Sequence, residues 1–190
     1  AEFSSGVSLD DAPLSHEVIV PLLNKPSNTP QVNAATPKRK IVADDIVRSF
    51  SPGSEWLSMK VYMGNSSGER LLAENILPLV SQFNQQGLIS HFFFLRYGDP
   101  DWHLRLRFKG DPAVLLTQVL PKLHQQLDPL HQSGLIQSLQ LDTYGQEVER
   151  YGGAAAINVA EHVFHTNSLL CLQLLHLLAE IPDDYRWRSV

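Results

Sequence analysis

The chain of 190 residues has a single cysteine, Cys171, so no internal disulfide can form. This cysteine lies in the leucine-rich run SLLCLQLLHLL, where a buried, unreactive thiol is far more common than a nucleophile. The apolar runs are too short, or too often interrupted by Gln and His, to cross a membrane. The N-terminus also lacks the basic and apolar segments of a secretory signal. These absences favour a cytoplasmic protein without a transmembrane segment.

Metal and phosphate motifs are missing as well. There is no G-x-x-x-x-G-K-[ST] phosphate loop, and the eight histidines do not follow the spacing of zinc ligands. His162 and His165 are three residues apart beside Glu161, which is not a zinc pattern. The net charge of −5 argues against a general nucleic-acid-binding protein. We therefore expect no metal, no cofactor and no direct nucleic-acid contact, and we interpret any cluster of arginines as a local site for a specific anion.

The first 50 residues do not form a globular pattern. Glu17–Leu23 reads as an isolated short strand, and Asn24–Lys40 has the Pro, Asn and Thr content of a linker. Ile41–Phe50 is predicted to form one or two helical turns. A lone strand is not stable. We therefore expect residues 1–23 to be the end of a preceding domain, 24–49 to be a flexible linker, and 50–190 to be the main domain.

From Trp56 onward the periodicity predicts the order βαββαβ followed by a long helix. The predicted fold class is α+β, with an antiparallel four-stranded sheet and helices on one face. Asp111 and Pro112 are expected to cap the second helix, and its prolines to bend or split it. Pro78 is expected to kink the first helix. The predicted elements are strands at 56–63, 92–95, 103–108 and 136–144 and helices at 69–86, 111–129 and 154–179.

The central segment Ser90–Lys109 combines an aromatic run with a basic one. Phe92–Leu95 is typical of a strand that is buried on both faces. After the turn Gly98–Asp101, three polar residues alternate with leucine and phenylalanine. A period of two places the polar residues on one face of the strand: His103, Arg105 and Arg107. This face is either an ordinary solvated one or an anion site.

A second polar segment, Asp142–Gly153, follows the last predicted strand. Glu147 and Arg150 are three residues apart, so on a helical turn they would share a face and form an ion pair. In a buried cleft this pair would orient the arginine toward an acceptor. Gly152 and Gly153 either break the chain before the long helix or allow a close backbone approach. Asn167 and Ser168 on that helix face either the cations or solvent.

Four motifs together resemble a known family. W-x-x-x-K-x-Y from Trp56, FFLRYGDPDWHLRLRF from Phe93, DTYGQEVERYGG from Asp142 and AEHVFHTNS from Ala160 occur in the order found there. They are similar to the C-terminal glutamate-elimination domain of class I lanthipeptide (lantibiotic) dehydratases, also called the thiopeptide-type bacteriocin biosynthesis domain. The segment HEVIVPL from His16 resembles the end of the glutamylation domain that precedes it in that family.

The resemblance implies a lyase-type β-elimination. Glutamate would be removed from glutamylated Ser or Thr of a ribosomally made precursor peptide, leaving dehydroalanine or dehydrobutyrine. A cationic cradle suits the two carboxylates of glutamate. The expected catalytic residues are Arg105, Arg107 and Arg150, with Glu147 orienting Arg150 and His103 as a support or proton carrier.

The implied partners are the precursor peptide, a glutamylation domain in cis or trans that would use glutamyl-tRNA, and a lanthionine cyclase. Two alternatives stay open: a cyclising enzyme of the pyridine-synthase type, and a non-catalytic module that binds the precursor peptide. The family usually has Asp-Ser where this chain has Asn167-Ser168. It also extends beyond Val190 and carries a further functional histidine there, so we expect an elimination domain truncated at its C-terminus.

Overall fold

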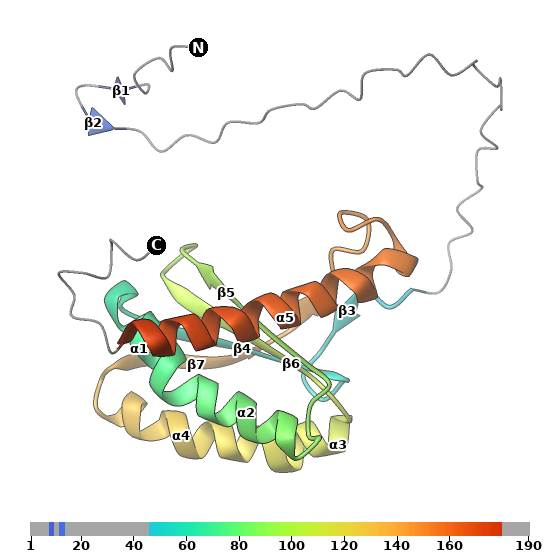
Figure 1. The fold of residues 1–190 in the computed structure, drawn as a ribbon, viewed down its shortest axis with the longest axis horizontal. Helices are drawn as coiled ribbons and strands as arrows, with labels where there is room; N and C mark the ends of the chain where they lie inside the picture. The colour runs from blue at the N-terminus through green and yellow to red at the C-terminus, as the bar shows by residue number, and fades with distance from the viewer. Residues whose placement is uncertain (1–7, 10–11, 14–45, 180–190) are drawn as a thin grey trace. The chain divides into compact units, whose positions relative to one another are not determined.

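The computed structural model describes residues 8–9, 12–13 and 46–179 (Figure 1). The chain divides into two compact units, residues 1–42 and 43–190. In the first unit, the short strands β1 (Ser8–Leu9) and β2 (Ala12–Pro13) pair antiparallel. The predicted strand Glu17–Leu23 and the linker after it lie outside the described residues, so the proposed division of the N-terminal region stays a prediction.

A four-stranded antiparallel sheet forms the centre of the second unit. Its order is β5-β6-β4-β7, with β4 at Trp56–Met63, β5 at His91–Tyr97, β6 at His103–Lys109 and β7 at Ile136–Asp142. All three strand pairs are antiparallel. The predicted βαββαβ order and the α+β class are therefore confirmed.

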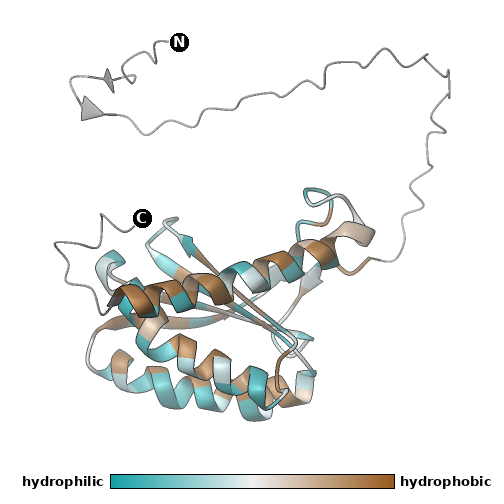
Figure 2. Ribbon diagram, in the orientation of Figure 1, coloured by the Kyte–Doolittle hydropathy of each residue, from teal (hydrophilic) through white to brown (hydrophobic). Residues whose placement is uncertain are grey.

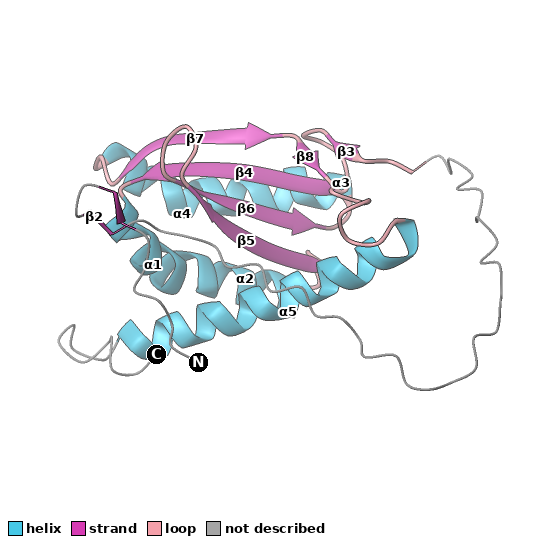
Figure 3. Cartoon of the chain, turned by 90° about the horizontal axis from the view of Figure 1, so that it is seen from above, coloured by secondary structure: helices cyan, strands magenta, loops and turns pink. Residues whose placement is uncertain are grey.

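Two helical segments cover one face of this sheet (Figures 1 and 3). A 3₁₀ turn, Asn65–Ser67, leads into the first, which comprises α1 (Gly68–Leu71), a π-helical turn over Leu72–Ile76 and α2 (Leu77–Gln85). The second comprises α3 (Pro112–Val114), a π-helical turn over Leu115–Val119 and α4 (Leu120–Gln132). Apolar and polar residues alternate around α2 and α4, as Figure 2 shows. The sheet and these helices share one core, which includes Leu57, Val61, Ile76, Phe83, Leu104, Leu106, Phe108, Leu115 and Leu123.

The expected helix irregularities take the form of π-helical turns. After each π turn, one leucine precedes a proline, Pro78 or Pro121, that lies in the first turn of the following helix. Proline lacks an N–H and clashes with the carbonyl four residues earlier, so a wider turn accommodates it. Of the two outcomes expected at Pro129, a bend or a split, the split does not occur, because α4 continues through this residue. The Asp111 cap is confirmed, since its carboxylate accepts a hydrogen bond from the Val114 N–H at 3.0 Å.

The long helix α5 (Ala154–Ala179) runs beside the edge strand β5 (Figure 3). His165 Nδ1 accepts a hydrogen bond from the Phe92 N–H at 2.9 Å, and Ser168 Oγ accepts one from the Phe94 N–H at 3.3 Å. These two side chains satisfy backbone donors that an open sheet edge would leave exposed. The helix therefore acts as the closing wall of the sheet on the β5 side.

Two predictions for the strands are wrong in detail. Within Ile41–Phe50, the described part is not helical: β3 (Ser49–Phe50) pairs with β8 (Tyr144–Gly145), because burial of Phe50 against Tyr144 outweighs local helix propensity. Phe92–Leu95 is not buried on both faces throughout. Phe92 and Phe93 are buried, but β5 is an edge strand and Leu95 is 42% exposed.

In β7 the apolar residues Ile136 and Leu139 are three positions apart, whereas regular alternation would separate them by an even number. The pairing of β7 with β4 shifts between Tyr62 and Met63, so Ile136 and Leu139 lie on opposite sides of an irregularity. A β-bulge adds a residue to one strand and shifts the phase of its side chains. Both residues consequently contact the core despite a spacing of three.

Candidate functional site: an arginine-lined pocket

A pocket of about 440 Å³ lies on the sheet face opposite α2 and α4. Strands β5 and β6, the segment after β7 and helix α5 all contribute to its walls. Of the predicted site residues, it gathers Arg105, Arg107, Glu147 and Arg150, although the first two and the last two lie in segments far apart in the sequence. The other lining residues are Phe93, Phe94, Leu95, Arg96, Tyr97, Tyr144, Gly145, Tyr151, Phe164, Asn167 and Ser168.

Arg105 projects from β6 and is held on two sides. Its Nε donates a hydrogen bond to His103 Nε2 at 3.1 Å, and its Cζ lies 3.7 Å from the centre of the Tyr97 ring. His103 does not line the pocket; it is fully buried behind Arg105, with 0% of its surface exposed. The predicted alternation of β6 is confirmed, because Leu104, Leu106 and Phe108 enter the core on the other face.

Arg107 is held between aromatic rings instead. Its Cζ lies 4.2 Å from the Tyr144 ring centre and 5.2 Å from that of Phe93. Burial lowers the pKa of this guanidinium, while the nearby Tyr144 acts in the opposite direction. Within the described part of the chain, its buried Nε has no hydrogen-bond partner. An orphaned, buried donor of this kind is suited to an anionic ligand.

The segment after β7 brings a third arginine to the pocket. Arg150 Nη1 donates to both carboxylate oxygens of Glu147, at 3.1 and 3.3 Å, which confirms the predicted i,i+3 pair. The pair does not lie in a buried cleft, because 70% of the Arg150 side chain and 55% of the Glu147 side chain are exposed. Gly152 and Gly153 follow with φ values of 89° and 88°, which end this segment before α5 begins.

A buried carboxylate ties this segment to α5. Glu161, 1% exposed, accepts a hydrogen bond at Oε1 from the Tyr144 hydroxyl at 3.0 Å and another from Gln146 Nε2. Its Oε2 lies 3.8 Å from Lys109 Nζ. Burial, followed by the Glu161 charge, raises the pKa of Tyr144 well above the ordinary value for tyrosine. The tyrosine that supports Arg107 is therefore a neutral hydroxyl donor.

Sequence reasoning missed this buried network. Glu161 was considered only as a neighbour of two histidines, and Tyr144 only as the end of a strand. One signal pointed to both: each lies inside a motif that carries the family resemblance. The alternatives left open for the helix are also resolved, since Asn167 and Ser168 line the pocket rather than facing away from it.

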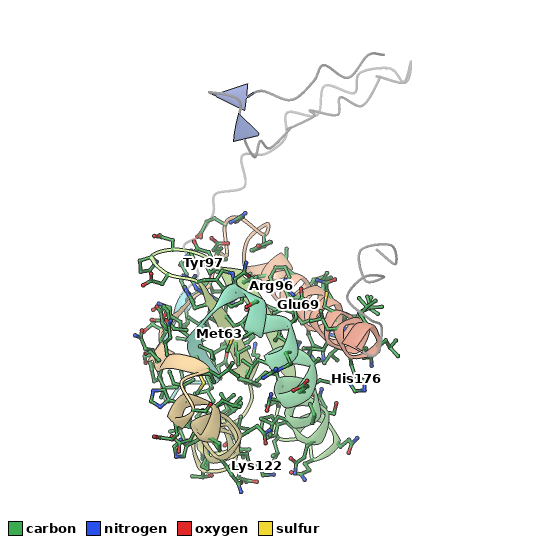
Figure 4. All side chains as sticks on the ribbon, turned by 90° about the vertical axis from the view of Figure 1, so that its left-hand side faces the viewer. Met63, Glu69, Arg96, Tyr97, Lys122 and His176 are labelled. Carbon is green, nitrogen blue, oxygen red and sulfur yellow. The ribbon has the colours of Figure 1, made fainter. Side chains whose placement is uncertain are left out.

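Two neighbouring cations are already neutralised by carboxylates. Lys60, opposite Arg105 on β4, lies 2.7 Å from Asp142, and this hydrogen bond lowers the pKa of the Asp142 carboxyl. Arg96 pairs with Glu69 of α1 at 3.3 Å (Figure 4). Across the described residues, no carboxylate lies within 4 Å of a nitrogen of Arg105 or Arg107. Two guanidinium groups thus face the pocket without a fixed counter-charge.

The described residues contain no group of three or more His, Cys, Asp and Glu side chains arranged to hold a metal ion. In the same part of the chain, no helix combines the length and apolar character needed to cross a membrane. The pocket is lined by guanidinium groups and hydroxyls, which bind and stabilise anions, and by the carboxylate of Glu147, which pairs with Arg150.

Comparison with known proteins identifies the family of the chain. Residues 56–188 match the family described as lantibiotic biosynthesis dehydratase, C-terminal. The chain belongs to this family. The match runs from the start of β4 past the end of α5, so every wall of the pocket lies inside the lantibiotic dehydratase C-terminal region.

Individual relatives support the assignment. The chain is 34% identical over 167 residues to the subtilin biosynthesis protein SpaB of Bacillus subtilis, which covers 86% of the chain and 15% of SpaB. It is 32% identical over 141 residues to the nisin biosynthesis protein NisB of Lactococcus lactis subsp. lactis, covering 73% of the chain and 14% of NisB. The chain thus spans about a seventh of the length of these relatives.

Solved structures have the same fold. The crystal structure of the tRNA-dependent lantibiotic dehydratase MibB from Microbispora sp. 107891 superposes with a TM-score of 0.65 and 29% identity, covering 73% of the chain and 13% of MibB. The structure of TsrL, at 22% identity, has a TM-score of 0.53 over 71% of the chain and 38% of TsrL, which shows a likeness of fold alone.

Proposed function

We propose that this chain is a glutamate-elimination domain of a lantibiotic dehydratase. It would act on Ser or Thr residues of a precursor peptide that carry glutamate as an ester, and release glutamate to leave dehydroalanine or dehydrobutyrine. The partners in this proposal are the precursor peptide, a glutamylation domain that uses glutamyl-tRNA, and a lanthionine cyclase acting later. The reaction would take place in the cytoplasm, where glutamyl-tRNA is made.

One observation carries the proposal: Arg105, Arg107 and Arg150 meet in one pocket, and two of them have no carboxylate partner among the described residues. A glutamyl ester keeps one free carboxylate, and the esterified carboxyl becomes a second carboxylate when glutamate leaves. Guanidinium groups bind carboxylates through paired hydrogen bonds. A dicarboxylate therefore matches the charge and the donor geometry of the pocket.

The elimination has two sites of developing negative charge. A base removes the peptide Cα proton, the electron pair forms the Cα–Cβ double bond, and the Cβ–O bond breaks to release the esterified carboxyl of glutamate as a carboxylate. Negative charge develops on the enolate oxygen and then on the leaving carboxylate. Guanidinium groups fixed before the reaction stabilise this charge without reorganising. In this proposal, Glu147 orients Arg150, and His103 acts behind Arg105.

The test is mass spectrometry of a synthetic glutamylated peptide incubated with the full-length protein. The variants are Arg105→Ala, Arg107→Ala and Arg150→Ala. Removal of one transition-state donor costs about 10²- to 10³-fold in rate, so glutamylated peptide should accumulate in each variant. Arg70→Ala is the matched control, because Arg70 is an exposed arginine of α1 that pairs with Glu74 and does not line the pocket.

The outcome separates the proposal from the two alternatives. Unchanged dehydration by Arg105→Ala and Arg107→Ala would contradict it. A wild-type protein that binds the glutamylated peptide but never releases glutamate would be a non-catalytic binding module. A product in which dehydrated residues have been joined into a ring, with glutamyl esters left intact, would indicate a cyclising enzyme.

A further inference from the structure

His103, the first residue of β6, uses both ring nitrogens. Its Nδ1 lies 2.8 Å from the Asp101 carbonyl oxygen, and its Nε2 lies 3.1 Å from Arg105 Nε. A carbonyl oxygen can only accept, so the proton is on Nδ1. Arginine Nε–H can only donate, so Nε2 must offer a lone pair. The two contacts together assign a neutral imidazole with one defined tautomer.

The ring also has no freedom to turn. Tyr62 and Tyr97 pack near it, with ring centres 4.7 and 5.7 Å away, and His103 has no exposed surface. A proton carrier needs a nitrogen that can reach substrate or solvent. With both nitrogens occupied and the ring enclosed, His103 has none.

Arg105 is consequently constrained along its length. His103 holds Nε, and the face of Tyr97 lies against the guanidinium plane. Among the described residues, its two terminal nitrogens have no hydrogen-bond partner, and Arg105 lines the pocket. A guanidinium fixed in this way loses less conformational freedom when it binds a carboxylate.

Arg107 provides a contrast within the same strand. It lies two residues further on the same face, but its Nε has no partner in the described structure and its support consists only of rings. The hydrogen-bonded support of Arg105 is therefore specific to that arginine and not a general property of β6.

We propose that His103 is a positioning residue that acts through Arg105, as a neutral acceptor that holds the guanidinium toward the pocket. This inference rests on the proposed function, because it takes Arg105 as the group that meets the carboxylate of the substrate. It replaces the alternative role of proton carrier. Loss of a hydrogen bond to a charged group corresponds to about a 10- to 100-fold fall in kcat/KM.

A double-mutant cycle tests the inference in the full-length protein, with glutamate elimination followed by mass spectrometry. His103→Phe keeps a ring and removes the acceptor, so kcat/KM should fall about 10- to 100-fold. His103→Gln places an amide oxygen near the position of Nε2 and should recover most of the loss. In an Arg105→Ala background, His103→Phe should cost less than about 2-fold, because its partner is already absent. Equal costs in both backgrounds, or no recovery by glutamine, would overturn the inference.

A measurement without turnover separates this inference from the proposed function. When the protein is labelled with ¹⁵N-histidine, NMR should show the signal of one histidine with a protonated Nδ1 and an unprotonated Nε2. This signal should be absent from His103→Gln. Arg105→Ala should shift the Nε2 resonance of that histidine. A wild-type protein that releases no glutamate but shows this signature would contradict the proposed function and leave the pairing with Arg105 supported. A proton on Nε2 would refute the pairing itself.

Discussion

Glu161→Ala should destabilise the fold and loosen one wall of the pocket. The carboxylate is buried on α5, yet the groups that it binds, Tyr144 and Gln146, belong to β8 and the residue after it. Alanine leaves the Tyr144 hydroxyl and the Gln146 amide without their acceptor. Both of these side chains are themselves buried, so solvent does not readily replace the lost oxygen.

The magnitude follows from the two orphaned donors. A buried donor without a partner costs about 1–3 kcal/mol. Two of them cost about 2–6 kcal/mol, and the lower half of this range applies because removal of the buried charge also relieves its desolvation. A loss of about 3 kcal/mol corresponds to a fall in Tm of roughly 12 °C, at about 4 °C per kcal/mol for a domain of this size.

Thermal unfolding followed by circular dichroism measures this loss, and Glu161→Gln is the matched control. Glutamine retains an acceptor oxygen but not the charge, and neutral hydrogen bonds are about half as strong. Its Tm should therefore lie between those of the wild type and Glu161→Ala. A Glu161→Ala variant that unfolds within about 2 °C of the wild type would refute the reasoning.

A tyrosine absorbance titration gives an independent readout of the same contact. Burial and the Glu161 charge raise the pKa of Tyr144 in the folded state. The folded state gains stability from keeping Tyr144 protonated. This gain is fully present below the ordinary tyrosine pKa of about 10 and is lost as pH rises through the pKa of Tyr144 in the folded protein. Glu161→Ala should bring this ionisation closer to the ordinary value, and Tyr144→Phe, which lacks the group, identifies its signal.

Three further predictions concern the frame of the site. Asp111→Ala removes the cap of α3 and should lower stability by about 1 kcal/mol, measured by urea unfolding. Asp142→Asn should destabilise the protein at neutral pH, because Lys60 holds the pKa of the Asp142 carboxyl below its ordinary value. The difference in stability from the wild type should disappear as pH falls through the folded pKa of Asp142, and urea unfolding curves at several pH values check this. Gly153→Ala should cost about 1 kcal/mol through backbone strain alone, since its φ is 88° and no atom lies within 4 Å of the added Cβ; its Tm checks this.

The periodic parts of the sequence predicted the fold well. Alternation along His103–Lys109 placed the arginines on one face and the leucines in the core, as observed. The spacing of Glu147 and Arg150 predicted their ion pair. In each case, the decisive interaction lies within one strand or one turn, so the local pattern contains enough information.

Predictions that depended on distant partners were less successful. Phe50 belongs to a strand because Tyr144 lies opposite it, and nothing in Ile41–Phe50 indicates that partner. Leu95 looks as apolar as Phe92, but Phe92 enters the core whereas Leu95 lines the open pocket and is exposed. Glu161 reads as an ordinary helix carboxylate, and its burial follows from how α5 packs against the segment after β7. Tertiary packing decides such positions, so local propensity is a weak guide to them.

The two arginines of β6 consequently depend on different parts of the chain. Arg105 is supported by His103 and Tyr97, both from the β5–β6 hairpin itself. Arg107 is supported by Phe93 of the same hairpin and by Tyr144, whose hydroxyl is held by Glu161 of α5. A substitution in α5 at Glu161 should therefore displace Arg107 and leave Arg105 in place, whereas a change at His103 should do the opposite. Each cation thus has one support that the other lacks, His103 for Arg105 and Tyr144 for Arg107, and the fold offers two separate contacts through which the pocket can be adjusted.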